Sequence, residues 1–378
     1  MGVQPAPAAI PLAFGCFHFL PILERGDRFD ASAYPDAVRE ALEDSPGIDN
    51  VGMSVDEEAL GWEAEVPGAP PSLAELGSPF PRMGHSGIRF DVRIPRRMQE
   101  DLLRGDRYGI GTEEFRVHLE YGYEMPVVAV EPLNPREGER PSRAVMLVRE
   151  FLIREFERSM RSTVTFDWLG PSPAHSDFYL IPSEAPEDCP GRFWLLDHTV
   201  RGYRRYRYGY RAEDFNDRSE VVDRFLFEAT SELSLYYALA QESCARMEAW
   251  DELEEMVTEL VGLQRKRGPF AFIRKTLLAS RKVSDAQLAL IEFRSRDVTA
   301  GGELERRCAK LYEQRGFSAA QALVEDRQSD RFEYPTAEIA ELLRLIETRR
   351  LTDRDVMMLG LASVLGGALG ALGGVLAG

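Results

Sequence analysis

The feature that most constrains this chain is Val356–Gly378, a segment of 23 residues without a single charged side chain. At a rise of about 1.5 Å per residue, a helix of this length reaches roughly 34 Å, which is enough to cross a hydrocarbon core of about 30 Å. Seven of the 23 residues are glycine, and each glycine costs about 0.8–1 kcal/mol relative to alanine in a helix exposed to water. The segment therefore predicts a helix that is held by lipid, by other protein or by both.

The small residues of this segment fall on one side of the predicted helix when each residue turns by about 100°. They include Ala362, Ser363, Gly366, Gly367, Gly370, Gly374 and Gly378. The leucines and valines fall on the other side, and from Leu361 onward only Ala368 breaks the division. The pattern resembles the glycine zippers of membrane homo-oligomers and of some pores, in which small residues let helices approach closely. The resemblance implies an assembly of identical chains in a lipid bilayer. An ordinary single-span anchor, or a tail buried in the protein's own core, are the alternatives.

Four arginines precede the uncharged segment, namely Arg344, Arg349, Arg350 and Arg354. Because positive charges flanking a membrane helix stay on the cytoplasmic side, they predict a single-pass protein of the cell inner membrane. The large N-terminal part is then cytosolic, as in a C-terminally tail-anchored protein.

The formal net charge of -17 excludes a general nucleic-acid binder, because such proteins present a cationic surface to phosphate groups. The charge also opposes attraction to anionic lipid, so attachment to a membrane must be hydrophobic. No phosphate loop, dinucleotide fingerprint, zinc-protease motif or nucleophile elbow occurs in the sequence. His175 and His198 stand near aspartates in sequence, but sequence neighbours on a strand do not face each other. We predict no catalytic residue, no metal site and no cofactor.

Residues 1–211 predict a cytosolic α+β head domain. Segments that alternate or run apolar, as strands do, are 9–23, 88–95, 115–123, 125–132, 177–182 and 192–200. Helices are predicted over 35–44 and over 142–161, the second with Ser142 as its N-cap. The residues between 182 and 192 suggest a hairpin or a longer connection, and residues 63–82, rich in proline, predict a surface loop.

Residues 212–350 predict a helical stalk or bundle without strands. Apolar residues recur at three- and four-residue steps from Val222 to Leu260, which indicates a helix of about forty residues with a coiled-coil seam. Gly268 and Pro269 end it. Further helices are expected over 270–281, 284–297, 302–315, 318–328 and 336–350, and residues 352–378 form the predicted membrane helix.

Residues 201–211 hold five arginines and four tyrosines in an otherwise acidic chain. Arginine binds phosphate or carboxylate through paired hydrogen bonds, and tyrosine stacks on a base. A candidate site for an anionic, nucleotide-like small molecule therefore includes Arg201, Tyr203, Arg204, Arg205 and Arg207. On a strand, Arg205 and Arg207 would face away from Arg204. The structural alternative has the arginines pair with the acidic residues that follow and the tyrosines pack on the stalk.

The order of an α/β head, long helices and a membrane helix near the C-terminus resembles the CorA-type magnesium channels. That family has two membrane helices with a Gly-Met-Asn motif between them, whereas this sequence has one such segment and lacks the motif. The resemblance is therefore one of architecture, and it does not imply magnesium transport.

These patterns lead to a membrane-anchored oligomer whose cytosolic head senses a signal or a protein partner. Its glycine-rich helices would assemble as a channel or as a membrane-disrupting effector of the kind used in stress or phage defence. One alternative is a tail-anchored scaffold or adaptor without pore activity. Another is a soluble ligand-binding module or enzyme whose tail is buried.

Overall fold

The computed structural model of the chain describes most of the sequence up to residue 352. The described residues are 9–21, 33–54, 60–61, 82–83, 87–103, 111–121, 125–135, 139–158, 164–169, 176–187, 189, 191–199, 204–265, 269–313, 317–352, 355 and 358–359. The chain divides into two compact units. The sheet unit comprises Met1–Glu242 and Leu304–Asp330, and the helical unit comprises Ser243–Glu303 and Arg331–Gly378. A mixed sheet followed by helices is the α+β arrangement that the sequence predicts.

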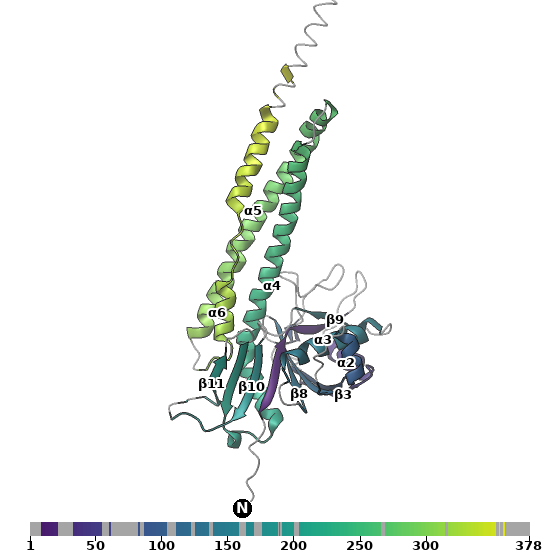
Figure 1. Cartoon of the computed structure of the whole chain (residues 1–378), viewed down its shortest axis with the longest axis vertical. Helices are drawn as coiled ribbons and strands as arrows, with labels where there is room; N and C mark the ends of the chain where they lie inside the picture. The colour runs from purple at the N-terminus through teal and green to yellow at the C-terminus, as the bar shows by residue number, and fades with distance from the viewer. Residues whose placement is uncertain are drawn as a thin grey trace, which may run out of the picture. The chain divides into compact units, whose positions relative to one another are not determined.

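The sheet unit is built on an eight-stranded sheet with the order β11-β12-β10-β1-β8-β7-β6-β3 (Figure 1). Its strands are β1 (Ile10–Gly15), β3 (Ile48–Ser54), β6 (Gly87–Arg93), β7 (Glu114–Tyr121), β8 (Pro126–Pro132), β10 (Ser176–Pro182), β11 (Phe193–Thr199) and β12 (Arg204–Tyr210). All neighbours are antiparallel except β10 and β12, which run parallel. Two shorter ladders pair β2 (Phe17–Pro21) with β9 (Val164–Trp168) and β4 (Leu60–Gly61) with β5 (Arg82–Met83).

Strand β1 lies in the middle of this sheet and is buried along its whole length. Successive side chains of a strand point to opposite faces, so both faces above β1 must be covered. On one face, Gly15 lies against α3 (Ser142–Arg158), where an added Cβ would be 2.7 Å from Cγ1 of Val145. Phe14 meets the other face, where its ring lies 6.3 Å from the ring of Phe225.

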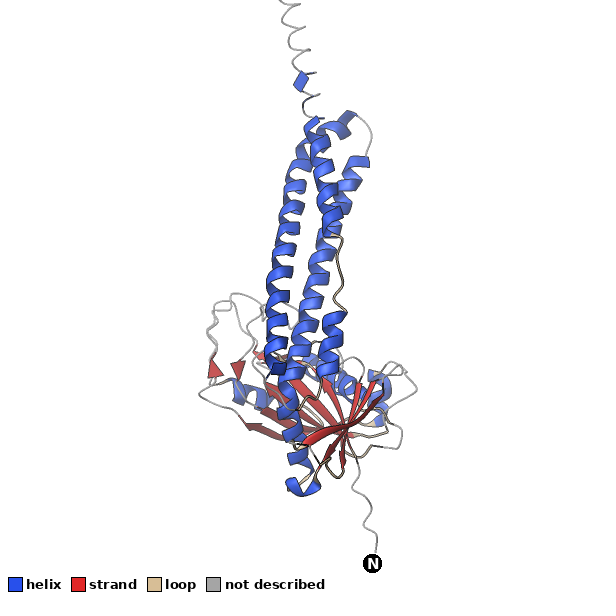
Figure 2. Ribbon diagram, turned by 90° about the vertical axis from the view of Figure 1, so that its left-hand side faces the viewer, coloured by secondary structure: helices blue, strands red, loops and turns tan. Residues whose placement is uncertain are grey.

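Helices cover both faces of the sheet (Figure 2). The first face carries α1 (Tyr34–Glu43), α2 (Arg96–Leu102) and α3 (Ser142–Arg158), whose apolar residues join one core with the sheet. The second face carries the first part of α4 (Arg218–Arg265), with a short 3-10 turn, η3 (Ala212–Asp214), ahead of it. The segment leading into α6 (Gln321–Ser329) also packs here, because the ring of Phe317 lies 5.8 Å from that of Tyr208.

The helical unit contains the rest of α4, most of α5 (Pro269–Glu313) and a helix over residues 336–352. The three helices lie side by side in both views (Figures 1 and 2). They share a core made of Leu253, Val257, Leu260, Val283, Ala286, Leu290, Leu343 and Ile346. These positions recur at three- and four-residue steps on each helix, which is the spacing of a seam in a coiled coil.

Most elements agree with the sequence-based expectations, and no strand occurs among the described residues after Tyr210. One expectation is wrong: residues 269–313 form one helix rather than three, because Val283, Ala286 and Leu290 bury the middle of α5 against its neighbours. Of the two alternatives for residues 182–192, the structure shows the longer connection, because β12 lies between the strands at 176–182 and 193–199. Ser142 begins α3, and its N–H donates to Asp177 at 2.9 Å.

Among the residues described, no helix is both long and apolar enough to cross a bilayer. The predicted membrane segment lies almost entirely outside them, with only residues 358–359 included. The predicted glycine face lies wholly outside, so Ala362, Ser363, Gly366, Gly367, Gly370, Gly374 and Gly378 stay predictions from the sequence. Residues 62–81, which cover most of the predicted surface loop, also lie outside.

Candidate functional site

The arginine- and tyrosine-rich segment forms β12, and its described residues separate onto two faces of the sheet. Arg204 forms an ion pair with Asp326 of α6. Arg207 lies on the opposite face, where its Nη1 is 2.8 Å from Oδ2 of Asp197, and the guanidinium of Arg205 stands 5.5 Å from the ring of Tyr179. Arg201 and Tyr203 lie outside the described residues. The structure therefore brings Arg205 and Arg207 together but not Arg204.

The tyrosines of β12 belong to the core of the sheet unit. Tyr206 and Tyr208 stack on Phe178, with ring centroids 5.2 and 6.3 Å away. The hydroxyl of Tyr208 donates to the carbonyl oxygen of Ala319, and burial raises the pKa of that hydroxyl well above its ordinary value. This face of the strand is packed, so it offers no space for a ligand to stack.

A network of charged residues lies between the sheet and α4. Nδ1 of His118 is 3.0 Å from Oδ1 of Asp223, and Arg89 forms an ion pair with the same aspartate. Glu131, which is fully buried, forms an ion pair with Arg218. Buried charges are stable only when they are paired, so this network fixes where α4 lies on the sheet.

Glu120 is the one acid of this region whose pKa is raised, to about 7. Burial is the main cause, the charge of Asp223 adds to it, and Arg89 opposes it. In the unfolded chain the pKa of Glu120 is about 4.5. Between pH 4.5 and pH 7, the folded protein therefore keeps a proton on Glu120 that the unfolded chain releases. The contribution of this protonated carboxyl to the stability of the folded protein is complete below pH 4.5 and is lost as the pH rises through 7.

We therefore expect Glu120→Gln to stabilise the sheet unit at pH 8 and to have little effect at pH 5. The gain at pH 8 should be about 1–2 kcal/mol, allowing for the partial exposure of the side chain. Hydrogen exchange of the β7 amides in urea, at both pH values, measures it. Glu100→Gln, on the exposed side of α2, is the matched control and should change neither value. An equal effect of Glu120→Gln at both pH values would contradict the assignment.

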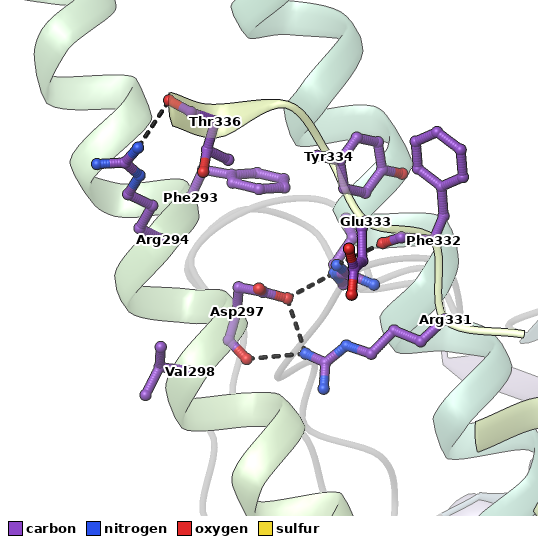
Figure 3. A pocket seen from close by; sticks show the side chains of 10 residues that line it. Phe293, Arg294, Asp297, Val298, Arg331, Phe332, Glu333, Tyr334 and Thr336 are labelled. Atoms are coloured by element: carbon purple, nitrogen blue, oxygen red, sulfur yellow. Dashed lines mark hydrogen bonds and ion pairs between the residues drawn. The ribbon is translucent and has the colours of Figure 1, made fainter. Parts of the chain in front are cut away.

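A cavity with converging charged groups lies in the helical unit and has a volume of about 550 Å³ (Figure 3). Helix α4 contributes Arg246, and α5 contributes Phe293, Arg294, Asp297 and Val298. The extended connection between α6 and the helix over 336–352 forms the remaining wall, through Arg331, Phe332, Glu333, Tyr334 and Thr336. Three separate segments of the helical unit thus meet at one site.

Asp297 organises the charges of this cavity. Its Oδ1 is 2.7 Å from Nε of Arg246 and 2.7 Å from Nη2 of Arg331. Arg246 also donates to the carbonyl oxygen of Phe332 at 3.1 Å, and Arg294 donates to that of Thr336 at 2.7 Å. The arginines thereby tie α4 and α5 to the connection (Figure 3).

Aromatic rings line the same cavity. The ring of Tyr334 lies 4.8 Å from that of Trp250, 5.3 Å from that of Phe293 and 4.9 Å from that of Phe332. The guanidinium of Arg246 stands 5.1 Å from the Tyr334 ring. Phe332 is nevertheless 65% exposed, which is unusual for a phenylalanine within an aromatic cluster.

Gly301 of α5 allows Arg331 to reach Asp297. An added Cβ at Gly301 would lie 2.1 Å from Nη2 of Arg331, whereas one at the neighbouring Gly302 would meet nothing within 4 Å. An alanine at position 301 would therefore require the Arg331 guanidinium to move.

This cavity was not predicted from the sequence. The available signals were the run Arg331–Tyr334, where charged and aromatic residues alternate between two helices, and the glycine pair in α5. Neither signal locates a site alone, because Arg246 comes from a segment about eighty residues earlier in the chain. Among the described residues, no group of three or more His, Cys, Asp or Glu side chains is placed to hold a metal ion.

Comparisons with known proteins name no relative. No protein-family model matches the sequence, and no curated protein and no solved structure is significantly similar to it.

Proposed function

We propose that the protein is a membrane-anchored oligomer whose cytosolic units receive a signal and whose membrane helices assemble in response. Residues 356–378 would insert in the bilayer and associate through the small-residue face that includes Gly366, Gly370 and Gly374. The large N-terminal part would stay in the cytosol, because Arg344, Arg349, Arg350 and Arg354 precede the uncharged segment. Assembly would open a channel or disrupt the membrane.

The observation that carries the proposal is the change from buried to exposed apolar residues along the helix over 336–352 and just after it. Leu343 and Ile346 are buried against α4 and α5. Further along, Leu351, Met358 and Leu359 are exposed large hydrophobic residues, and residues 355 and 358–359 are again helical. Met358 and Leu359 are adjacent, and contiguous exposed apolar side chains mark surfaces that another molecule or a membrane covers. Insertion of the following segment in lipid would cover them.

The test compares the full chain with a variant lacking residues 352–378. After expression and cell fractionation, we expect the full chain in the membrane pellet and the shortened chain in the supernatant. Recovery of the full chain as a monomer in the soluble fraction without detergent would refute the proposal and favour the alternative with a buried tail.

Gly370→Leu tests assembly. The added side chain would separate helices that approach through the glycine face, so crosslinked oligomers in the membrane fraction should fall by about tenfold. Ala368→Leu places the same side chain on the opposite side of the predicted helix and should leave the crosslinks unchanged. Equal crosslinking in the two variants would refute assembly through the glycine face.

Membrane permeability and growth of the expressing cells separate an effector from a scaffold. Growth arrest that Gly370→Leu abolishes supports the channel or membrane-disrupting effector. Membrane-bound protein that leaves growth and permeability unchanged supports the tail-anchored scaffold.

A further inference from the structure

We infer that the cavity of the helical unit binds a nucleoside monophosphate, an organic anion with a flat aromatic ring and one phosphate group. The inference concerns the signal received by the cytosolic part, and it rests on the proposed function only in treating occupancy as that signal.

The charge of the cavity favours an anion. Three arginines line it against two carboxylates, Asp297 and Glu333, so its wall carries net positive charge in a chain of net charge -17. Asp297 pairs with Arg246 and Arg331. Arg294 is exposed and donates to the carbonyl oxygen of Thr336. A guanidinium carries five N–H donors, more than one carbonyl oxygen accepts, so Arg294 can also bind a phosphate oxygen.

The aromatic residues favour a flat ring as the second part of the ligand. Phe332 is largely exposed although Tyr334 and Phe293 form a packed aromatic wall beside it. A base stacked on an aromatic side chain gains about 1–3 kcal/mol of binding free energy in proteins that bind single-stranded nucleic acid. Inorganic phosphate would use the arginines but leave this surface exposed.

The size of the cavity, about 550 Å³, fits the same class of ligand. Pockets for small molecules and cofactors have volumes of about 300–1,000 Å³. A single phosphate would leave much of this space empty, whereas a base, a ribose and one phosphate occupy it.

The position of the cavity links its occupancy to the membrane segment. Thr336 lies in the wall and also begins the helix over 336–352, which leads toward residues 356–378. The bond from Arg294 to the carbonyl oxygen of Thr336 holds the start of this helix to α5. A phosphate bound by the remaining N–H groups of Arg294 shares the guanidinium with that bond, so binding alters how the helix is held at its first residue.

Calorimetric titration of the full chain in detergent micelles tests the site, with AMP, GMP, CMP and UMP used in separate titrations. We expect at least one of them to bind with a dissociation constant between about 10 μM and 1 mM. Inorganic phosphate and the corresponding nucleoside should each bind at least about tenfold more weakly, because each lacks half of the recognised groups. No binding of any of the four overturns the inference, and equal binding of phosphate overturns the part that concerns the ring.

Five variants assign the binding to this cavity. Arg294→Gln and Phe332→Ala should each weaken binding by about tenfold. Arg296→Gln, on an exposed arginine of the same helix that does not line the cavity, should leave affinity within about twofold. Gly301→Ala displaces the Arg331 guanidinium and should weaken binding, whereas Gly302→Ala should not. Unchanged affinity in both Arg294→Gln and Phe332→Ala overturns the site.

Failure of this inference can be distinguished from failure of the proposed function. Membrane residence and crosslinking are measured without nucleotide, and titration reports binding whether or not the chain resides in a membrane. A membrane-bound oligomer that binds none of the four nucleotides refutes the ligand site alone. A soluble monomer that binds one of them refutes the membrane proposal alone.

Discussion

Replacement of Phe225 by alanine is expected to lower the free energy of unfolding of the sheet unit by about 3–5 kcal/mol. Phe225 is fully buried on α4, and its ring lies 5.2 Å from that of Phe193, 5.1 Å from that of Tyr208 and 6.4 Å from that of Phe317. These rings belong to β11, to β12 and to the segment before α6. The alanine variant leaves a cavity where three parts of the unit meet, and rigid aromatic neighbours cannot collapse to fill it.

Hydrogen exchange of the β11 and β12 amides in increasing urea measures this loss within the full chain. Phe227→Ala is the matched control, since Phe227 is on the same helix but is 55% exposed. It contacts Arg224, whose guanidinium is 5.2 Å from its ring, so its removal should cost less than about 1 kcal/mol. If both variants lost the same stability, packing at Phe225 would not hold α4 on the sheet.

Asp297→Asn is expected to destabilise the helical unit by about 2–3 kcal/mol. The change removes the charge that Arg246 and Arg331 share, while Arg246 is only 6% exposed. Leaving a buried charge without its counter-charge costs about 3–5 kcal/mol, and the partial exposure of Asp297 reduces the effect. Asparagine keeps the size and one acceptor oxygen, so the loss reports on charge rather than on packing.

Hydrogen exchange measures the loss of stability caused by Asp297→Asn. The amides to be monitored are those of α4 after Ser243 and those in the middle of α5. Asp285→Asn, on an exposed position of the same helix, should have an effect below about 0.5 kcal/mol. Combining Asp297→Asn with Arg246→Met should restore part of the loss, because the buried charge is then removed as well. A double variant as unstable as the sum of the single variants would show that charge pairing is not the cause.

The strands that the sequence predicted correctly are those with a clear local pattern. β6 alternates between buried and half-buried residues, and β8 is an unbroken buried run, so each can be recognised from its own residues. β3 was missed because its sequence IDNVGMS contains Asp, Asn and Gly, which favour turns. It forms a strand because β6 offers an edge for pairing, and a tertiary partner is not visible in a local pattern.

The segmentation of α5 failed for a similar reason. Ser284 is typical of a helix start, and Gly301 with Gly302 is typical of a helix end. The helix continues through all three because burial of Val283, Ala286 and Leu290 outweighs local preferences of about 1 kcal/mol each.

The candidate site was predictable only in its chemistry. Arginine beside tyrosine in β12 suggested an anionic ligand, and the described part of β12 instead divides between a packed core and an exposed face. A similar combination of arginine and aromatic residues recurs around the cavity, but Arg246, Arg294 and Arg331 come from three segments. Their convergence depends on the packing of helices, which no spacing in the sequence encodes.

The central place of β1 has a consequence for how the protein is made. β1 precedes the other described strands along the chain, yet its two neighbours are β8 and β10. The aromatic core on one of its faces, where Phe14 lies beside Phe225, also includes Phe317. Partners so distant along the chain delay folding and leave apolar surface uncovered meanwhile. The apolar faces of β1 thus stay partly uncovered during synthesis, until residue 317 has been made and can pack beside Phe225.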